Sequence, residues 1–179
     1  MKILAISGSL RADSFNTQLL QAAGQIVQAQ GHEFEIYDYA DVPLYNQQID
    51  GDNKPDSVKQ LITAIESADG LLVATPEYNY SFSGVLKNAI DWASRPAYKS
   101  CLAHKKVAIV SASMSPIGGV RAQAHLRDVF AGTLTDVYRA PDFALATAQN
   151  AFSASGSLLD EKIQANLNRL IEGYLDWLV

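Results

Sequence analysis

The sequence of 179 residues contains only one cysteine, Cys101, so no disulfide can form within the chain. Basic residues are also few, since 14 Lys and Arg stand against 19 Asp and Glu. The resulting net charge of -5 argues against a protein that binds nucleic acid or anionic membranes. No apolar run is long enough to cross a bilayer, and no signal peptide is recognisable. The single thiol and these absences predict a cytoplasmic protein.

The composition is that of a globular protein, with 48% hydrophobic and 18% charged residues. Its length predicts a single domain over residues 1–179. Three strand-like runs are almost continuously apolar, as strands buried on both faces of a parallel sheet are, and two others alternate as strands nearer the edges do. In chain order the five runs are Lys2–Ser7, Glu33–Tyr39, Gly70–Thr75, Lys106–Ala112 and Leu134–Ala140.

Helical patterns separate these strands, with apolar residues on one face of each segment. They cover the segment from the first loop to Gly31, a segment after Pro55, Gly84–Ser94, Gly119–Ala131 and a last helix from Ser157. At the start of this last helix, Ser157 and Asp160 resemble a variant capping box. Alternating strands and helices predict an α/β fold, a doubly wound five-stranded parallel sheet with helices on both faces. Five strands favour the flavodoxin-like order 2-1-3-4-5, whose ligands bind beyond the carboxyl ends of the strands.

The first loop, "GSLRADSFN", joins a strand to a helix and is rich in groups that bind anions. A helix N-terminus presents free N–H groups and a partial positive charge, which suit a phosphate. Ser9, Ser14, Asn16 and Thr17 add donors, and Arg11 adds charge. Capping by Ser14 or Asn16 is the alternative interpretation, but it needs neither Ser9 nor Arg11. The loop lacks the P-loop and G-x-G-x-x-G patterns, which favours a single phosphomonoester over ATP or a pyrophosphate.

The third strand runs into "TPEYNYSFSG", a connection more polar and aromatic than a plain crossover needs. Tyr78 and Tyr80 offer flat surfaces, and Glu77 and Asn79 offer polar groups. This loop therefore suits a planar heterocycle with a polar edge. A capped, tyrosine-rich surface turn is the alternative.

Together, "GSLRADSFN", "PEYNYSFSGVLKNAIDW" and "SASMSPIGGVRAQAHLR" make the chain resemble the NADPH-dependent FMN reductase family, which includes quinone, azo-dye and chromate reductases. The resemblance covers essentially the whole chain and implies a flavodoxin-like fold. The positions that match the family's FMN-binding segments are Ser9, Arg11, Ser14, Phe15, Asn16 and Thr17 for the phosphate, Pro76, Glu77, Tyr78 and Asn79 along the flavin, and Ser113, Gly118 and Gly119 near the ring edge. Ser83 departs from the family pattern, since relatives often carry proline there.

The resemblance implies an enzyme in which bound FMN takes hydride from NADPH or NADH and passes it to quinone, flavin, azo or oxyanion acceptors. No catalytic side chain and no metal is then required, and His32, His104 and His125 lack the spacing of metal ligands. Relatives imply a homodimer or homotetramer. Two alternatives remain from the sequence. A flavodoxin-type electron carrier would usually have a T-G-N-T phosphate loop, and the other candidate is a non-flavin module that binds a phosphosugar or nucleotide.

Two further features stay open at this point. Arg121 and His125 fall on the helix beside the predicted site, where they are suited to nucleotide phosphates, to a subunit contact or to solvent. Cys101 is interpreted as a structural thiol rather than a nucleophile.

Overall fold

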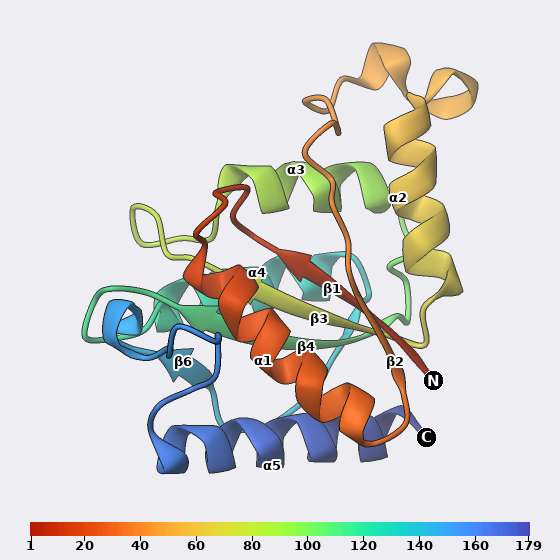
Figure 1. The fold of residues 1–179 in the computed structure, drawn as a ribbon. Coiled ribbons are helices and arrows are strands. Elements are labelled where there is room, and N and C mark those ends of the chain that lie inside the picture. Colours follow the sequence, from red (N-terminus) through yellow and green to blue (C-terminus); the bar gives the residue numbers. More distant parts are fainter.

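The protein is described over residues 1–179 by a computed structural model, in which one open parallel sheet carries helices on both faces (Figure 1). The strands are β1 (Lys2–Ser7), β2 (Glu33–Ile36), β3 (Gly70–Thr75), β4 (Lys106–Ala112), β5 (Asp136–Val137) and β6 (Phe143–Leu145). The α-helices are α1 (Phe15–Ala29), α2 (Asp56–Ser67), α3 (Gly84–Ala93), α4 (Val120–Gly132) and α5 (Glu161–Leu178). The strand order is β2-β1-β3-β4-β5, with β6 also pairing with β4, so the flavodoxin-like order is confirmed.

The three central strands owe their position to their continuous apolar sequence. Every residue of β3 is buried, and in β1 and β4 only the first residues are partly exposed. The edge strand β2 instead alternates exposed and half-buried positions. The sequence pattern thus correctly separates strands covered on both faces from strands at the edge.

Two helical layers cover the sheet, each with its own apolar cluster. On one face α1 and α5 pack against alternate residues of β1, β3 and β4, and the cluster includes Leu20, Val110 and Ile171. On the other face α2, α3 and α4 cover the remaining residues of these strands, with Leu61 and Leu126 among those buried. Figure 1 shows the loops that follow β1, β3 and β4 at the end of the sheet away from both termini.

The predicted fifth strand is shorter than its sequence pattern indicates. Pairing with β4 stops after Val137, and the chain returns to β4 only at Phe143, where β6 begins. Pro141 lies in the intervening segment and has no N–H to donate to a sheet ladder. The last strand is therefore split into two short pieces at the edge of the sheet.

The last helix begins four residues later than predicted from its capping pattern. Asp160 caps it directly, since its side chain accepts hydrogen bonds from the N–H groups of Lys162 and Ile163 at 2.8 and 3.0 Å. Ser157 lies before the helix and does not form a capping box with Asp160. None of the five helices has the length and apolar character needed to cross a bilayer.

Candidate functional site

The loops after β1, β3 and β4 meet at the carboxyl edge of the sheet. The N–H of Gly8 donates to the carbonyl of Ala74 at 2.7 Å. A Cβ at Gly8 would lie only 3.0 Å from Cδ of Pro76, so glycine permits this close approach. Asn16 joins the first loop to Ala112 at the end of β4. The topology therefore brings together the three segments that the sequence analysis singled out.

The N-terminus of α1 is capped but keeps free backbone donors. Oγ of Ser14, which is buried, accepts from the N–H of Thr17 at 3.3 Å. Helical hydrogen bonding begins with Gln18, whose N–H donates to the carbonyl of Ser14. The N–H groups of Phe15 and Asn16 therefore have no acceptor within the helix. The first turn contains no acidic residue, so the positive end of the helix dipole is not neutralised there.

Two of the predicted phosphate donors are already used inside the protein. Asn16 is 3% exposed, and its Nδ2 donates to the carbonyl of Ala112 at 3.0 Å while its Oδ1 accepts from the same residue's N–H at 2.9 Å. Oγ1 of Thr17 donates to Oγ of Ser7 at 2.9 Å. What Asn16 can offer an anion is therefore its backbone N–H, and its side chain fixes where that N–H lies.

Ser9 and Arg11, unlike Asn16 and Thr17, lie in the accessible part of the loop. Arg11 is exposed, donates from Nη2 to the carbonyl of Asp13 at 3.0 Å, and has its guanidinium carbon 5.4 Å from the centre of the Phe15 ring. Oγ of Ser9 accepts from the N–H of Arg11 at 3.4 Å and keeps its own proton available. An accessible cation, a hydroxyl and two backbone N–H groups form a donor set that fits a phosphomonoester.

The loop after β3 forms a tight hairpin. Tyr78 and Ser81 exchange two backbone hydrogen bonds, of 2.8 and 3.0 Å. Between them Asn79 and Tyr80 both have positive φ, of 49° and 69°, which is the pattern of a type I′ turn. The turn leaves the rings of Tyr78 and Tyr80 exposed. Flat aromatic surfaces are thus held at the rim of the site, as the sequence predicts.

An ion pair fastens this hairpin to α4. The guanidinium of Arg121 lies 3.3 Å from Oε1 of Glu77, and the backbone N–H of Arg121 donates to Oε2 at 3.2 Å. The Glu77 side chain is only 10% exposed, so the pair is partly shielded from solvent. The same guanidinium lies 4.0 Å from the centre of the Tyr80 ring, in a cation–π contact. Nδ1 of His125 lies 3.1 Å from Oγ of Ser81.

Sequence reasoning missed this role of Arg121, because the partner residues are separated by 44 positions. The only available signal was that Glu77 lies two residues after a buried strand and that Arg121 is the second residue of the helix after the next strand.

The loop after β4 depends on two glycines. Gly118 has a φ of 65°, and a Cβ there would lie 2.5 Å from the carbonyl oxygen of Ala144, so no side chain fits. Gly119, with a φ of 89°, precedes α4. The backbone of Ser113 is fixed by a hydrogen bond from its N–H to the carbonyl of Leu145 at 3.0 Å. This loop is therefore held from behind by β6.

Two remaining residues of the sequence analysis have structural roles. Oγ of Ser83, which replaces the proline common in relatives, accepts from the N–H of Leu86 at 3.4 Å and caps α3. Burial raises the pKa of the Cys101 thiol to about 12, and its Sγ lies 3.3 Å from the carbonyl of Ala93. A buried thiol with a raised pKa is a poor nucleophile, which agrees with a structural role for Cys101.

Comparison with known proteins finds similar proteins over almost the whole chain. A protein 42% identical over 177 residues, an NAD(P)H-dependent FMN reductase of Pseudomonas aeruginosa, is matched over 99% of this chain and 95% of its own. A 2-hydroxy-1,4-benzoquinone reductase of a Burkholderia species is 38% identical, over 99% of this chain and 96% of its own.

A solved structure extends the comparison to the fold. FerB, a flavoenzyme NAD(P)H:(acceptor) oxidoreductase from Paracoccus denitrificans, superimposes with a TM-score of 0.91 at 35% identity, covering 99% of this chain and 97% of FerB. The family profile described as NADPH-dependent FMN reductase matches residues 1–150. The chain belongs to the NADPH-dependent FMN reductase family.

Proposed function

We propose that this protein is an FMN-dependent NAD(P)H oxidoreductase that reduces small-molecule acceptors, quinones among them. Family membership supports the assignment, as do the FMN reductase and benzoquinone reductase named above. When bound, FMN supplies the hydride chemistry, by accepting hydride from a nicotinamide and delivering it to the acceptor. The protein's own part is to bind, to orient and to stabilise charge.

The observation that carries the proposal is the donor set at the start of α1. The free N–H groups of Phe15 and Asn16 would donate to the FMN phosphate at the positive end of the helix, where no acidic residue of the first turn opposes it. Arg11 and Ser9 would add a charge and a hydroxyl from the loop. Ser14 and Thr17 hold the helix start in shape through their internal hydrogen bonds.

The other two loops provide backbone donors for a polar ring edge. The N–H groups of Glu77, Asn79 and Met114 donate to no other group of the chain. Preorganised N–H groups of this kind stabilise negative charge that develops during reaction. The ion pair between Glu77 and Arg121 holds the hairpin after β3, and with it the N–H groups of Glu77 and Asn79, in place.

The exposed rim suits flat, apolar reactants and a partner subunit. Leu10, Tyr78, Tyr80 and Met114 surround the site and are between 48% and 66% exposed. We infer that a nicotinamide or a quinone stacks within this rim and that a second copy of the chain covers part of it in a homodimer or homotetramer. Residues 1–179 would act as one FMN-binding domain, and the lone Cys101 supports a cytoplasmic location.

The assignment is tested by an Arg11→Ala variant in titrations of the protein with FMN, followed by flavin fluorescence. Loss of a charge-assisted hydrogen bond is expected to weaken FMN binding by roughly tenfold to a hundredfold. The midpoint of urea unfolding should hardly change, because Arg11 is exposed. Arg139→Ala, which removes an exposed arginine outside the three loops, is the matched control. Equal FMN affinity of Arg11→Ala and wild type would refute the phosphate assignment.

A second measurement separates an enzyme from an electron carrier. Mixing the FMN-loaded protein with NADPH or NADH in the absence of oxygen should bleach the flavin absorbance rapidly. A flavin that stays oxidised with both nucleotides would favour the carrier.

A further inference from the structure

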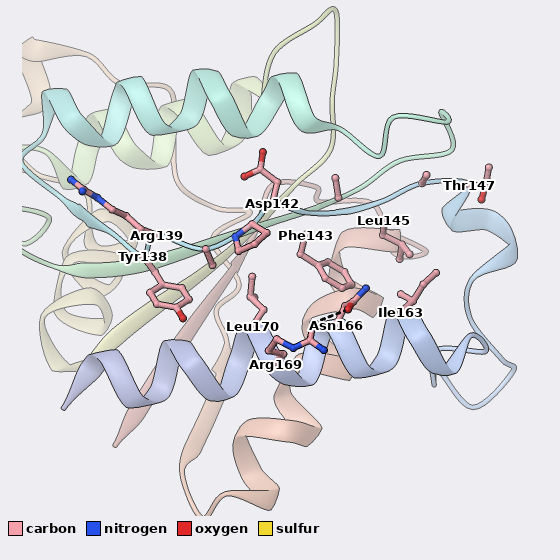
Figure 2. A pocket seen from close by; sticks show the side chains of 14 residues that line it. Tyr138, Arg139, Asp142, Phe143, Leu145, Thr147, Ile163, Asn166, Arg169 and Leu170 are labelled. Atoms are coloured by element: carbon pink, nitrogen blue, oxygen red, sulfur yellow. Dashed lines mark hydrogen bonds between the residues drawn. The ribbon is translucent and has the colours of Figure 1, made fainter.

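A cavity of about 590 Å³ lies between α5 and the segment around β6, at the edge of the sheet opposite β2 (Figure 2). Cavities of roughly 300–1,000 Å³ are typical of sites for small molecules. None of the residues assigned above to FMN binding lines this cavity. It is therefore a separate feature of the molecule, with no part in the proposed reaction.

The cavity has an apolar floor. Phe143 and Leu145 from β6 face Ile163 and Leu170 from α5 across it (Figure 2). Phe143, Leu145 and Leu170 are buried, and Ile163 is half-buried. The lining also includes residues 139–142, which lie between β5 and β6 and do not belong to either strand. A floor of this kind fits the flat hydrocarbon part of a ligand rather than a hydrated ion.

The polar groups at the cavity are dominated by one positive charge. Arg169 and Asn166 project from α5 toward the strand segment, and Nη1 of Arg169 donates to Oδ1 of Asn166 at 3.1 Å (Figure 2). No carboxylate pairs with Arg169, so its other N–H groups remain available. The acidic residue of the lining, Asp142, points toward α4 and is paired with Arg127 at 2.5 Å.

Two further residues define the site. The hydroxyl of Tyr138, at one end of the cavity, makes no hydrogen bond within the chain, although the ring is half-buried. Arg139 belongs to the lining segment, but its side chain points away from the cavity floor (Figure 2). The cavity thus combines an apolar floor, one oriented guanidinium and one free hydroxyl.

We propose that this cavity binds a small aromatic anion, a carboxylate or a sulfonate, as a second ligand beside FMN. The anionic group pairs with the exposed Arg169, which donates to Asn166, and the ring lies on Phe143 and Leu170. A guanidinium without a carboxylate partner selects an anion, and the apolar floor selects against inorganic phosphate or sulfate.

One short segment connects the cavity to the loop after β4. Residues 145–147 line the cavity, and residues 145 and 148 hydrogen-bond to that loop: the N–H of Ser113 donates to Leu145, and the N–H of Ala148 donates to Ser113, both at 3.0 Å. The two sites adjoin each other without sharing a side chain. The anion and FMN are therefore expected to bind at the same time.

The test is calorimetric titration of the FMN-saturated protein with naphthoate, with neutral naphthalene carboxamide as the matched probe. One naphthoate is expected per chain, and the carboxamide and an Arg169→Gln variant should each weaken binding by at least about tenfold. Arg139→Gln removes the same charge from a side chain that points away, and should leave the affinity within about twofold. Ile163→Phe, which fills part of the cavity from a half-buried position, should also weaken binding.

The same titration of the protein without FMN keeps this proposal separate from the proposed function. Binding that survives without FMN and follows Arg169 supports the cavity whether or not the protein is a reductase. Absence of naphthoate binding, equal binding by Arg169→Gln, or competition between naphthoate and FMN would each overturn the proposal. Binding of the carboxamide as tightly as naphthoate would also overturn it, because the site would then not select an anion.

Discussion

Truncation of Asn16 to alanine is expected to destabilise the protein far more than its place in a ligand loop would imply. The side chain makes two hydrogen bonds, of 2.9 and 3.0 Å, to the backbone of Ala112, and both residues are buried. In Asn16→Ala the N–H and the carbonyl of Ala112 lose their partners in a space that asparagine no longer fills. Each unpaired buried group costs about 1–3 kcal/mol, so the free energy of unfolding should fall by roughly 2–6 kcal/mol.

The measurement is urea unfolding of the protein without FMN, so that loss of ligand cannot contribute to the result. Asn150→Ala is the control, because Asn150 is exposed and its side chain makes no hydrogen bond within the chain. Its unfolding free energy should stay within about 0.5 kcal/mol of wild type. If Asn16→Ala showed a loss that small, the bonds to Ala112 would not hold the loop. The side chain would then be free to serve the phosphate, as the sequence alone indicates.

Two further predictions concern parts of the molecule away from the site. Lys106 donates from Nζ to the carbonyls of Trp177 and Leu178 at the end of α5, at 2.8 and 2.9 Å. Lys106→Met should therefore lower the free energy of unfolding, measured in urea, by about 1–2 kcal/mol. Lys162→Met, which removes an exposed lysine, should leave it unchanged. Burial raises the pKa of Cys101 from 9.0 to about 12, so its alkylation by iodoacetamide near pH 8 should be about a thousandfold slower in the native than in the unfolded protein. Because the folded protein holds this proton more tightly, the free energy of unfolding should fall as the pH rises above about 9. Equal alkylation rates in the native and the unfolded protein would contradict the burial.

The central sheet could be predicted residue by residue because burial on both faces leaves a strong sequence signal. Lys2–Ser7, Gly70–Thr75 and Lys106–Ala112 are strands with the bounds expected from their apolar runs. The last strand could not be predicted in this way, since apolar alternation over Leu134–Ala140 does not reveal which residues find a partner in β4. There the covalent restriction of Pro141 and the return of the chain to β4 decide the pairing.

The location of the site followed from topology, whereas the partners of its side chains did not. Parallel strands place their carboxyl ends at one edge, so the loops after β1, β3 and β4 had to meet. The sequence could not indicate that Asn16 would pair with Ala112, 96 residues away, or that Arg121 would pair with Glu77. An asparagine in a polar loop is equally compatible with an anion and with a buried backbone, and only the fold distinguishes the two.

This distinction changes what selects the anion in the first loop. The side chains of Asn16 and Thr17 are hydrogen-bonded to Ala112 and Ser7, so in the proposed FMN site a phosphate would be recognised mainly by backbone N–H groups and by Arg11. Backbone donors keep their positions only while the internal hydrogen bonds hold the turn, so we expect the loss of the Asn16 side chain to weaken FMN binding more than the loss of the Ser9 hydroxyl. A count of polar residues in the loop therefore overstates the number of direct ligands. Such a count also leaves out the side chains, that of Asn16 among them, that would hold the backbone donors in place without contacting a phosphate.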